Sequence, residues 1–461
     1  MFGNPFTRLL GAATALLVLA LSASFILPAP WSWAVGLVYV GYDTWLLLSM
    51  VLASRRALRT PPPNAGPRRP QTLAVLIAAR NEREVLPQAL AALFAQTSPA
   101  ERVVLIDDGS TDGTRALLEQ EYAVRFEGRL GESALHPALQ VLSKVNSGKA
   151  RSLNEALELV REDVVVTLDA DTVLEPEALA AVRREFEQDE KLAAACGVLS
   201  PHCAGAVTAP FFAFYQTFEY LRGFLWRLAW MSDHTLVLVS GAFAAFRRER
   251  LAEVSGFDPH SRVEDYELMF RLHRLSLERG EPLVARIIGE ARASTDAPAR
   301  LPVFLRQRTR WFAGFIETMF RNQDLVGNGK FGRLGRYHLR VKTIDTLLPI
   351  YGLCALLLLG AFLASGRGLP PIILAVLAGK FLFDLTCHFL CVVMYRRWQG
   401  GRVDLRFALQ ALGATLTEPL LFQVFRQFGA LLGWIAFLRG RIEWHPQRFA
   451  ATKPAARAEE P

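Results

Sequence analysis

The chain has 461 residues, of which 51% are hydrophobic and 21% charged, and its mean hydropathy is +0.21. This balance is too apolar for a purely soluble protein of this length and excludes a disordered chain. The 52 Lys and Arg exceed the 44 Asp and Glu, giving a net charge of +8, which fits a membrane surface, a nucleic acid or an anionic substrate. The 5 scattered cysteines form no C-x-x-C pair, so we expect reduced, buried thiols.

Two apolar runs at the N-terminus predict a transmembrane hairpin over residues 1–56. Residues 9–27 are uninterrupted, and residues 31–53 contain only one charge, Asp43. Each run approaches the roughly 20 residues that span a bilayer. Several arginines follow residue 54, which places this flank in the cytoplasm. A cleaved signal peptide is the alternative for the first run, because small residues lie at 22–24.

The C-terminal region predicts a second transmembrane bundle over residues 344–440. Residues 347–364 and 371–395 are apolar and are followed by Arg396 and Arg397. Residues 407–438 are apolar but interrupted by Glu418-Pro419 and Arg426, which leaves one span, a re-entrant pair or an interfacial helix open. Residues 441–461 form a basic, partly disordered tail, and their charge favours a cytoplasmic C-terminus and an even number of crossings.

Residues 70–343 contain no run long enough to span a membrane and predict a soluble α/β insert. Apolar strings at 73–78, 103–106, 164–168 and 192–199 alternate with helical patterns. Such alternation indicates a mostly parallel sheet covered on both faces. Ligands bind at the carboxyl ends of such strands. Polar clusters follow the first three strings at Arg80-Asn81-Glu82, Asp107-Asp108-Gly109 and Asp169-Ala170-Asp171.

Carboxylates that converge at one sheet edge indicate a divalent cation. Asp169 and Asp171 supply hard oxygen ligands two residues apart, which suits Mg²⁺ or Mn²⁺ shared with substrate phosphates. A capped turn is the alternative for a single Asp-x-Asp. The sequence Asn146-Ser147-Gly148-Lys149-Ala150 lacks the glycine and the Ser/Thr of a phosphate loop, and no G-x-G-x-x-G is present. A sugar nucleotide therefore remains as the phosphate ligand.

These residues resemble the family 2 glycosyltransferases with a GT-A fold, in particular the membrane-embedded cellulose, hyaluronan and poly-N-acetylglucosamine synthases. The resemblance covers about residues 73–314 and implies a GT-A, Rossmann-like domain inserted between transmembrane helices. Its motifs, in order, are Ala78-Ala79-Arg80-Asn81-Glu82, Asp107-Asp108-Gly109-Ser110-Thr111-Asp112, Gly148-Lys149-Ala150 with Leu153-Asn154, Asp169-Ala170-Asp171, Ser240-Gly241-Ala242-Phe243, Glu264-Asp265 and Gln307-Arg308-Thr309-Arg310-Trp311.

The resemblance also implies a role for each site residue. Asp265 would be the general base that deprotonates the acceptor hydroxyl, giving inversion, and Asp171 with Asp169 would hold the metal. The implied donor ligands are Glu82, Asp107, Asp108, Lys149, Asp169, Arg308 and Arg310. The implied acceptor ligands are Glu264, Gln307 and Trp311. The alternatives are a helix N-terminal pair for Glu264-Asp265 and an interfacial aromatic for Trp311.

We therefore predict an inverting UDP-sugar hexosyltransferase that extends a β-linked polysaccharide from the cytoplasmic face of the cell inner (plasma) membrane. Single-sugar transfer to a membrane lipid is the runner-up, and a non-enzymatic transporter or scaffold is the third alternative. We expect membrane lipids and a small membrane subunit as partners. Nucleic acid is not expected, because the basic residues flank apolar runs instead of forming a basic face.

Two further segments have open alternatives. Residues 211–231 predict either an amphipathic helix on the bilayer face or a core helix of the insert. Lys380, Asp384 and His388 share one helical face, because they are spaced four apart. They either line an acceptor path or include a structural Lys380–Asp384 pair near Glu418.

Overall fold

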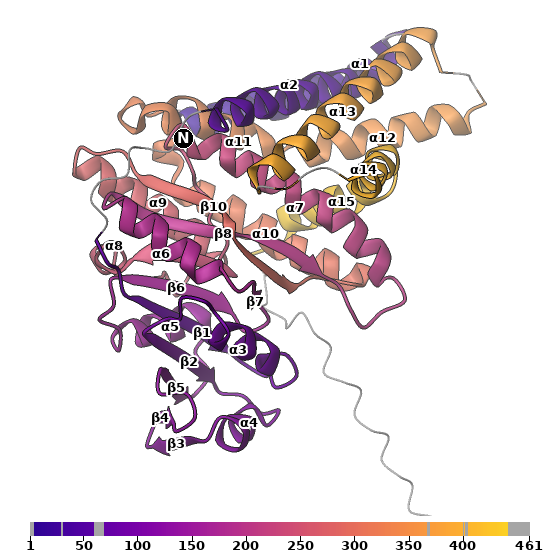
Figure 1. Ribbon diagram of the computed structural model, residues 1–461. Coiled ribbons are helices and arrows are strands. Elements are labelled where there is room, and N and C mark those ends of the chain that lie inside the picture. Colours follow the sequence, from indigo (N-terminus) through magenta and orange to yellow (C-terminus); the bar gives the residue numbers. More distant parts are fainter. Residues whose placement is uncertain are drawn as a thin grey trace, which may run out of the picture.

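The computed structural model describes residues 4–28, 31–59, 69–366, 369–399, 401 and 404–440. An α/β unit lies below a bundle of long apolar helices that come from both ends of the chain (Figure 1). The predicted tail, residues 441–461, lies outside the described residues. The predicted domain boundaries stay a prediction.

One mixed sheet forms the centre of the α/β unit, with the strand order β3-β4-β5-β2-β1-β6-β9-β8-β10-β7. Its strands are β1 Leu73–Ala79, β2 Arg102–Asp108, β3 Val124–Glu127, β4 Leu130–Ser133, β5 Leu139–Lys144, β6 Val164–Asp169, β7 Val173–Leu174, β8 Leu192–His202, β9 Phe243–Arg247 and β10 Val284–Asp296. The four strands predicted from apolar strings are β1, β2, β6 and β8, and all four are confirmed.

The sheet is more mixed than the alternation of strands and helices predicts. Neighbours β5, β2, β1 and β6 are parallel, as are β8 and β10. Strand β9 lies between β6 and β8 and runs antiparallel to both. It is only five residues long, so its sequence signal is weak beside those of the long buried strands.

The register of the parallel strands brings the predicted polar clusters together. Ala79 pairs with Asp107 across β1 and β2, and Ala78 pairs with Asp169 across β1 and β6. The three strands therefore end level with one another, and the loops that follow them meet at one sheet edge.

Helices cover the sheet and join it to the apolar bundle. Those of the α/β unit are α3 Leu86–Phe94, α4 Thr114–Glu121, α5 Lys149–Leu157, α6 Ala178–Gln188, α7 Ala209–Met231, α8 Arg248–Glu253, α9 Glu264–Glu278 and α10 Leu301–Arg321. Helix α7 packs against β8 and β10 and also against α2 and α13. Its buried side chains include Phe212, Phe218, Phe224 and Leu228, so α7 is a largely buried helix between the sheet and the apolar bundle. The position of residues 211–231 relative to a bilayer stays a prediction.

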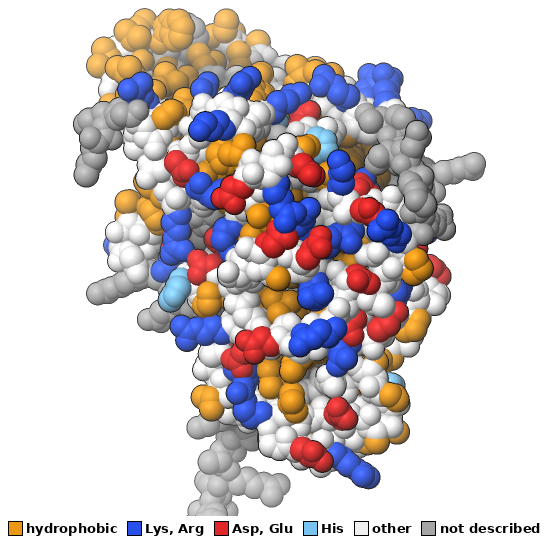
Figure 2. Space-filling model, turned by 90° about the vertical axis from the view of Figure 1, so that its left-hand side faces the viewer, with side chains coloured by type: hydrophobic (Ala, Val, Ile, Leu, Met, Phe, Trp, Pro, Cys, Tyr) orange, Lys and Arg blue, Asp and Glu red, His pale blue; other side chains and the backbone are white. Residues whose placement is uncertain are grey.

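The apolar helices are α1 Pro5–Ile26, α2 Ala34–Ala57, α11 Leu339–Asp345, α12 Leu348–Ala364, α13 Pro371–Trp398, α14 Leu405–Thr417 and α15 Phe422–Leu438. Short turns of 3₁₀-helix lie at Trp31–Trp33, Gln323–Leu325 and Gly329–Phe331, and a π-turn at Leu334–His338. Apolar side chains gather at the bundle end, whereas charges of both signs cover the α/β unit (Figure 2).

Four helices among the described residues are long and apolar enough to cross a membrane: Pro5–Ile26, Trp31–Ala57, Leu334–Ala364 and Pro371–Trp398. Helices α14 and α15 form a pair bent by 58°. The bend follows Glu418 and contains Pro419, which cannot donate a helical hydrogen bond. Residues 407–438 are thus a broken span or a re-entrant loop and not one straight helix, and the even number of crossings stays a prediction.

Candidate active site

The loops after β1 and β2 hold each other through hydrogen bonds. Asn81 has a positive φ of 59°, and its N–H donates to Ser110 Oγ over 3.0 Å. The Thr111 N–H donates to Asn81 Oδ1 over 2.7 Å. Glu82, a predicted donor ligand, follows Asn81 on this loop and is half-buried.

Asp107 and Asp108 are almost fully buried at the end of β2, at 3% and 4% exposed. Asp107 Oδ1 accepts from the Ser110 N–H over 3.0 Å. Asp108 accepts from the N–H groups of Ser147 and Gly148 over 2.8 and 2.9 Å. Asp108 therefore fixes the start of α5, which carries Lys149 as its first residue.

Lys149 connects two of the predicted clusters. Its Nζ lies 2.6 Å from Asp169 Oδ1 and 3.1 Å from Glu264 Oε1. Burial favours the neutral amine, but the two carboxylates outweigh it and raise the pKa of Lys149. Burial likewise works to raise the pKa of Glu264, and the Lys149 ammonium reverses this and lowers it. Lys149 and Glu264 are therefore both charged.

Asp265 lies in the first turn of α9 with both carboxylate oxygens hydrogen-bonded. Oδ2 accepts from the Gly241 N–H over 2.7 Å, and Oδ1 accepts from the Tyr266 N–H over 2.8 Å. Burial, and next the charge of Glu264, raises the pKa of Asp265 to about 6. A carboxylate with a raised pKa beside a charged lysine is typical of a functional site.

Asp171 lies beyond β6 and faces the end of β10. Its Oδ1 accepts from Thr295 Oγ1 over 2.9 Å. Among the described residues, no group of three or more His, Cys, Asp or Glu side chains could hold a metal ion. Magnesium in nucleotide sites is held by one or two carboxylates together with substrate phosphates, so the pair Asp169 and Asp171 fits a shared metal better than an all-protein cage.

The two arginines of the Gln307–Trp311 motif face different ways. Arg308 Nη2 lies 2.6 Å from Glu219 Oε2 on α7. Arg310 Nη1 reaches the Arg262 carbonyl at 3.5 Å, and its charge is among those that lower the pKa of Glu264 against the effect of burial. Residues two apart on a helix point about 200° apart, so Arg308 and Arg310 leave α10 from different faces, and a donor role for both stays a prediction.

Trp311 and Gln307 share a helix face, because they are four residues apart. Trp311 is 36% exposed and Gln307 is buried at 5%. The Arg308 guanidinium lies 4.5 Å from the centre of a Trp311 ring. Trp311 therefore has an exposed ring that is packed from one side.

Sequence reasoning missed Thr295, which bonds Asp171, and Glu219, which pairs with Arg308. Glu219 is the one acidic residue in α7, among many aromatic side chains. A lone carboxylate in an apolar helix is a usable signal, because burying it requires a partner.

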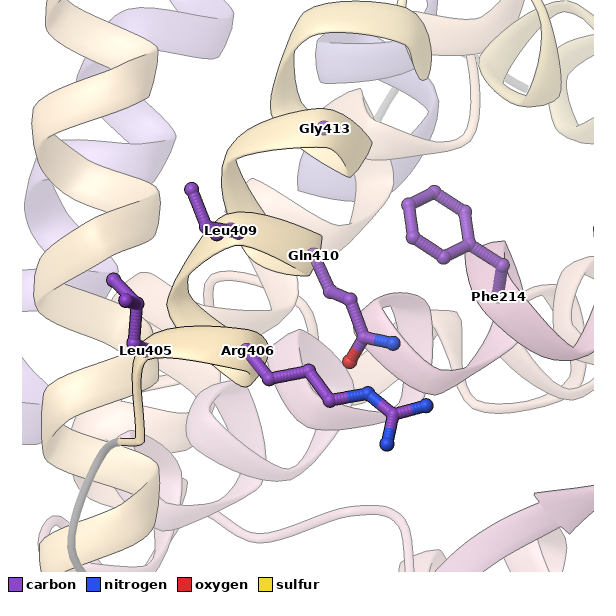
Figure 3. Close-up of a pocket in the computed structure, with 6 residues that line it drawn as sticks. All are labelled: Phe214, Leu405, Arg406, Leu409, Gln410 and Gly413. Atoms are coloured by element: carbon purple, nitrogen blue, oxygen red, sulfur yellow. The ribbon is translucent and has the colours of Figure 1, made fainter.

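The open hollow between α7 and α14 is separate from this cluster. Phe214 comes from α7, and Leu405, Arg406, Leu409, Gln410 and Gly413 come from α14 (Figure 3). None of the predicted site residues lines it.

In the apolar bundle, Lys380 Nζ lies 2.7 Å from Asp43 Oδ2 and also contacts Asp384. The Lys380–Asp384 pair predicted from spacing is present, with Asp43 as an additional partner. The acceptor path past these residues stays a prediction.

Comparison with known proteins shows which family the chain resembles. Residues 74–254 match the model of glycosyl transferase family 2, so this part of the chain is similar to that family. Poly-beta-1,6-N-acetyl-D-glucosamine synthases from Staphylococcus epidermidis and Staphylococcus aureus strain COL are each 26% identical over 282 residues, or 60% of this chain. The aligned part spans 62% of the length of these relatives.

A solved structure gives the fold. The mannosyltransferase PcManGT from Pyrobaculum calidifontis, in complex with GDP-Man and Mn²⁺, aligns with a TM-score of 0.52 and 19% identity. The alignment covers 90% of this chain and 99% of that one. The expected GT-A-like fold, with apolar helices at both ends of the domain, is thereby confirmed.

Proposed function

We propose that this protein is a membrane-embedded, inverting glycosyltransferase that moves a sugar from a UDP-sugar to a growing β-linked polysaccharide. The observation that supports this most is the contact of Lys149 with both Asp169 and Glu264, directly beside Asp265. A base for the acceptor and groups for a nucleotide diphosphate thus occur in one cluster. The names of the relatives make UDP-N-acetylglucosamine the first donor to test.

Asp265 is the proposed general base. With a pKa of about 6 it is mainly ionised at neutral pH and still basic enough to take a proton there. The Gly241 N–H holds its carboxylate in one orientation. Asp265 would accept the proton of the acceptor hydroxyl as that oxygen attacks the anomeric carbon on the face opposite UDP.

The donor site is proposed to consist of Glu82, Asp107, Asp108, Lys149, Asp169 and Arg310. Asp107 and Asp108 shape the loops of this site through backbone hydrogen bonds. Lys149 and Arg310 provide positive charge for a departing diphosphate. Asp171 and Asp169 would hold Mg²⁺ or Mn²⁺, which neutralises charge on the diphosphate when bound.

The acceptor side is proposed to consist of Trp311, Gln307 and Glu264. The exposed ring of Trp311 offers an apolar face on which a sugar ring can stack. Arg308 does not join the donor site in this proposal, since its guanidinium is already paired with Glu219 on α7.

The domain is proposed to face the cytoplasm from the inner membrane. Helices α2 and α13 both end in arginine pairs, and both ends touch the α/β unit. Near the end of α2, Ser54 Oγ donates to the Leu225 carbonyl on α7, and Trp398 of α13 packs over Gly289 of β10. By the positive-inside rule, these arginines support a cytoplasmic position for the α/β unit.

The test is UDP or GDP release by the purified full chain in lipid nanodiscs, with Mg²⁺ or Mn²⁺, a panel of UDP-sugars and GDP-mannose. Mass spectrometry of the product completes it. A ladder of added sugars supports the polymer, and a single sugar on a lipid would replace it with the lipid acceptor. No release from any donor would contradict the proposal.

A further inference from the structure

Five charged side chains connect α10 to the apolar helices, outside the cluster around Lys149. We call them the α7 charge array: Arg308 from α10, Glu219 and Arg222 from α7, Glu418 from the bend between α14 and α15, and Arg426 from α15. Glu219 lies at its centre. Its Oε2 lies 2.6 Å from Arg308 Nη2, and its Oε1 lies 3.3 Å from Arg426 Nε.

The array continues from Arg426 to the bend. Arg426 Nη1 lies 3.0 Å from Glu418 Oε1, which Arg222 also contacts. The side chains of Arg308 and Glu418 are only 9% and 7% exposed. Buried charges of this kind need their partners, because removal of one partner leaves the others uncompensated.

The guanidinium of Arg308, which pairs with Glu219, also contacts the ring of Trp311. This group lies 4.6 Å from the ring centre of Phe304 and 4.5 Å from that of Trp311. Both contacts are cation–π interactions, which depend on the placement of the cation over the ring. A carboxylate on α7 thus fixes the cation that packs one face of an exposed aromatic on α10.

Close helix packing supports the same connection. A Cβ atom on Gly429 of α15 would lie 2.7 Å from Arg308 Cβ. The backbone of α15 therefore approaches α10 at the residue that Glu219 pairs with. Glu219 is thereby bonded to one arginine from each of two helices that are in direct contact.

We propose that Glu219 is a positioning residue for the sugar acceptor: it holds Arg308 against Trp311 and connects α10 to the bent pair α14–α15. The proposal rests on the proposed function, in which Trp311 stacks on the acceptor. Glu219 itself touches neither substrate.

The first test needs no substrate. Hydrogen–deuterium exchange is measured on the full chain in nanodiscs for the unaltered protein, Glu219→Gln and the control Glu190→Gln. Glu190 makes an exposed pair with Arg69, so the control makes the same chemical change where it matters little. In Glu219→Gln we expect exchange in residues 301–321 to accelerate about fivefold, with residues 149–157 unchanged.

The second test separates acceptor from donor. The probe is an oligosaccharide of β-1,6-linked N-acetylglucosamine, with UDP-N-acetylglucosamine as the donor. Glu219→Gln should raise the acceptor KM about tenfold and change the donor KM less than about twofold. Glu219→Asp keeps the charge and should restore part of the acceptor affinity. If Glu219→Gln fails to fold, Arg426→Gln takes its place. This variant keeps the Glu219–Arg308 pair, so its acceptor KM should lie between that of the unaltered protein and the value expected for Glu219→Gln.

Equal changes in acceptor and donor KM, or unchanged exchange in residues 301–321, would overturn the proposal. A lack of UDP release by the unaltered protein with every donor would overturn the proposed function, and with it the acceptor role of Glu219. Faster exchange in residues 301–321 would then still support the connection between α7 and α10.

Discussion

The carboxylate of Asp265 and the backbone N–H of Gly241 are joined by a hydrogen bond of 2.7 Å, and a Cβ atom at position 241 would lie 3.0 Å from the same Oδ2 atom. A side chain at position 241 would therefore crowd the carboxylate of the proposed base. The loop before β9 and the start of α9 are 24 residues apart in the chain, and this bond fixes their relative position.

Gly241→Ala should lower kcat by about tenfold without unfolding the protein, because the new methyl group displaces the Asp265 carboxylate. Gly223→Ala on α7 is the matched control, since a Cβ there meets nothing within 4 Å. The measurement is UDP release together with a thermal melt. A Gly241→Ala protein with unchanged kcat would show that the orientation of Asp265 does not matter.

Asp265→Asn should reduce kcat by about 10²–10⁴-fold, the range of a general base, while UDP still binds. The raised pKa predicts the pH profile of the unaltered enzyme: the ionised base is lost, and kcat falls, as pH drops through about 6. Folding raises the pKa of this acid, so the ionised form at pH 8 destabilises the fold. The Asn variant removes this destabilising charge, but its amide group replaces one of the two oxygens that accept from backbone N–H groups, so the gain is offset by one lost hydrogen bond. Retained turnover would remove Asp265 as the base.

Lys149→Met should move the acid limb of the pH profile upward. Burial and the charge of Glu264 raise the pKa of Asp265, and the ammonium of Lys149 works against them and lowers it. Without this cation the pKa of Asp265 should rise further. We also expect the donor KM to rise about tenfold or more, as a phosphate contact is lost. The exposed Lys191 is the site of the control, Lys191→Met. An unshifted acid limb would mean that Lys149 does not act on Asp265.

A contact in the site is easier to predict from the sequence when its residues belong to recognisable motifs than when they are far apart along the chain and one of them lies outside any motif. Continuous apolar strings predict β1, β2, β6 and β8, and their register brings Asp107 and Asp169 to one edge. Both features follow from the pattern of apolar residues along the chain and from the parallel order of the strands. The direction of Arg308 is different, because its partner Glu219 is 89 residues away on a helix with no motif.

Strand β10 illustrates the same limit within the sheet. Its burial alternates along Val284–Asp296, and its polar residues include Arg286, Glu290 and Arg292. A half-buried strand of this kind is easily missed beside continuous apolar strings. With it the sequence reading missed Thr295, the hydroxyl that bonds Asp171.

Asp171→Asn should raise the concentration of Mn²⁺ needed for half-maximal activity about tenfold or more, because a charged ligand becomes neutral. Thr295→Val keeps the Asp171 carboxylate but removes the hydrogen bond that Thr295 Oγ1 donates to it, together with the one that Thr295 Oγ1 accepts from Thr172. It should raise this Mn²⁺ concentration about two- to fivefold. Thr97, which is exposed, provides the control Thr97→Val. The measurement is a metal titration of UDP release at saturating donor. Equal metal dependence in all three variants would exclude Asp171 as a ligand.

Gly433→Leu tests whether α15 must lie close against α10. A Cβ on Gly433 would lie 2.8 Å from Phe312 Cβ, as Gly429 similarly approaches Arg308. Small residues four apart allow helix backbones to approach in a membrane, so a leucine here forces the helices apart. We expect a loss of about 1–3 kcal/mol, the typical cost of overpacking, measured by reversible denaturation in detergent. Gly360→Leu on α12 is the control, because position 360 has open space around its Cβ. The same loss in both variants would mean that the close α10–α15 contact does not stabilise the protein.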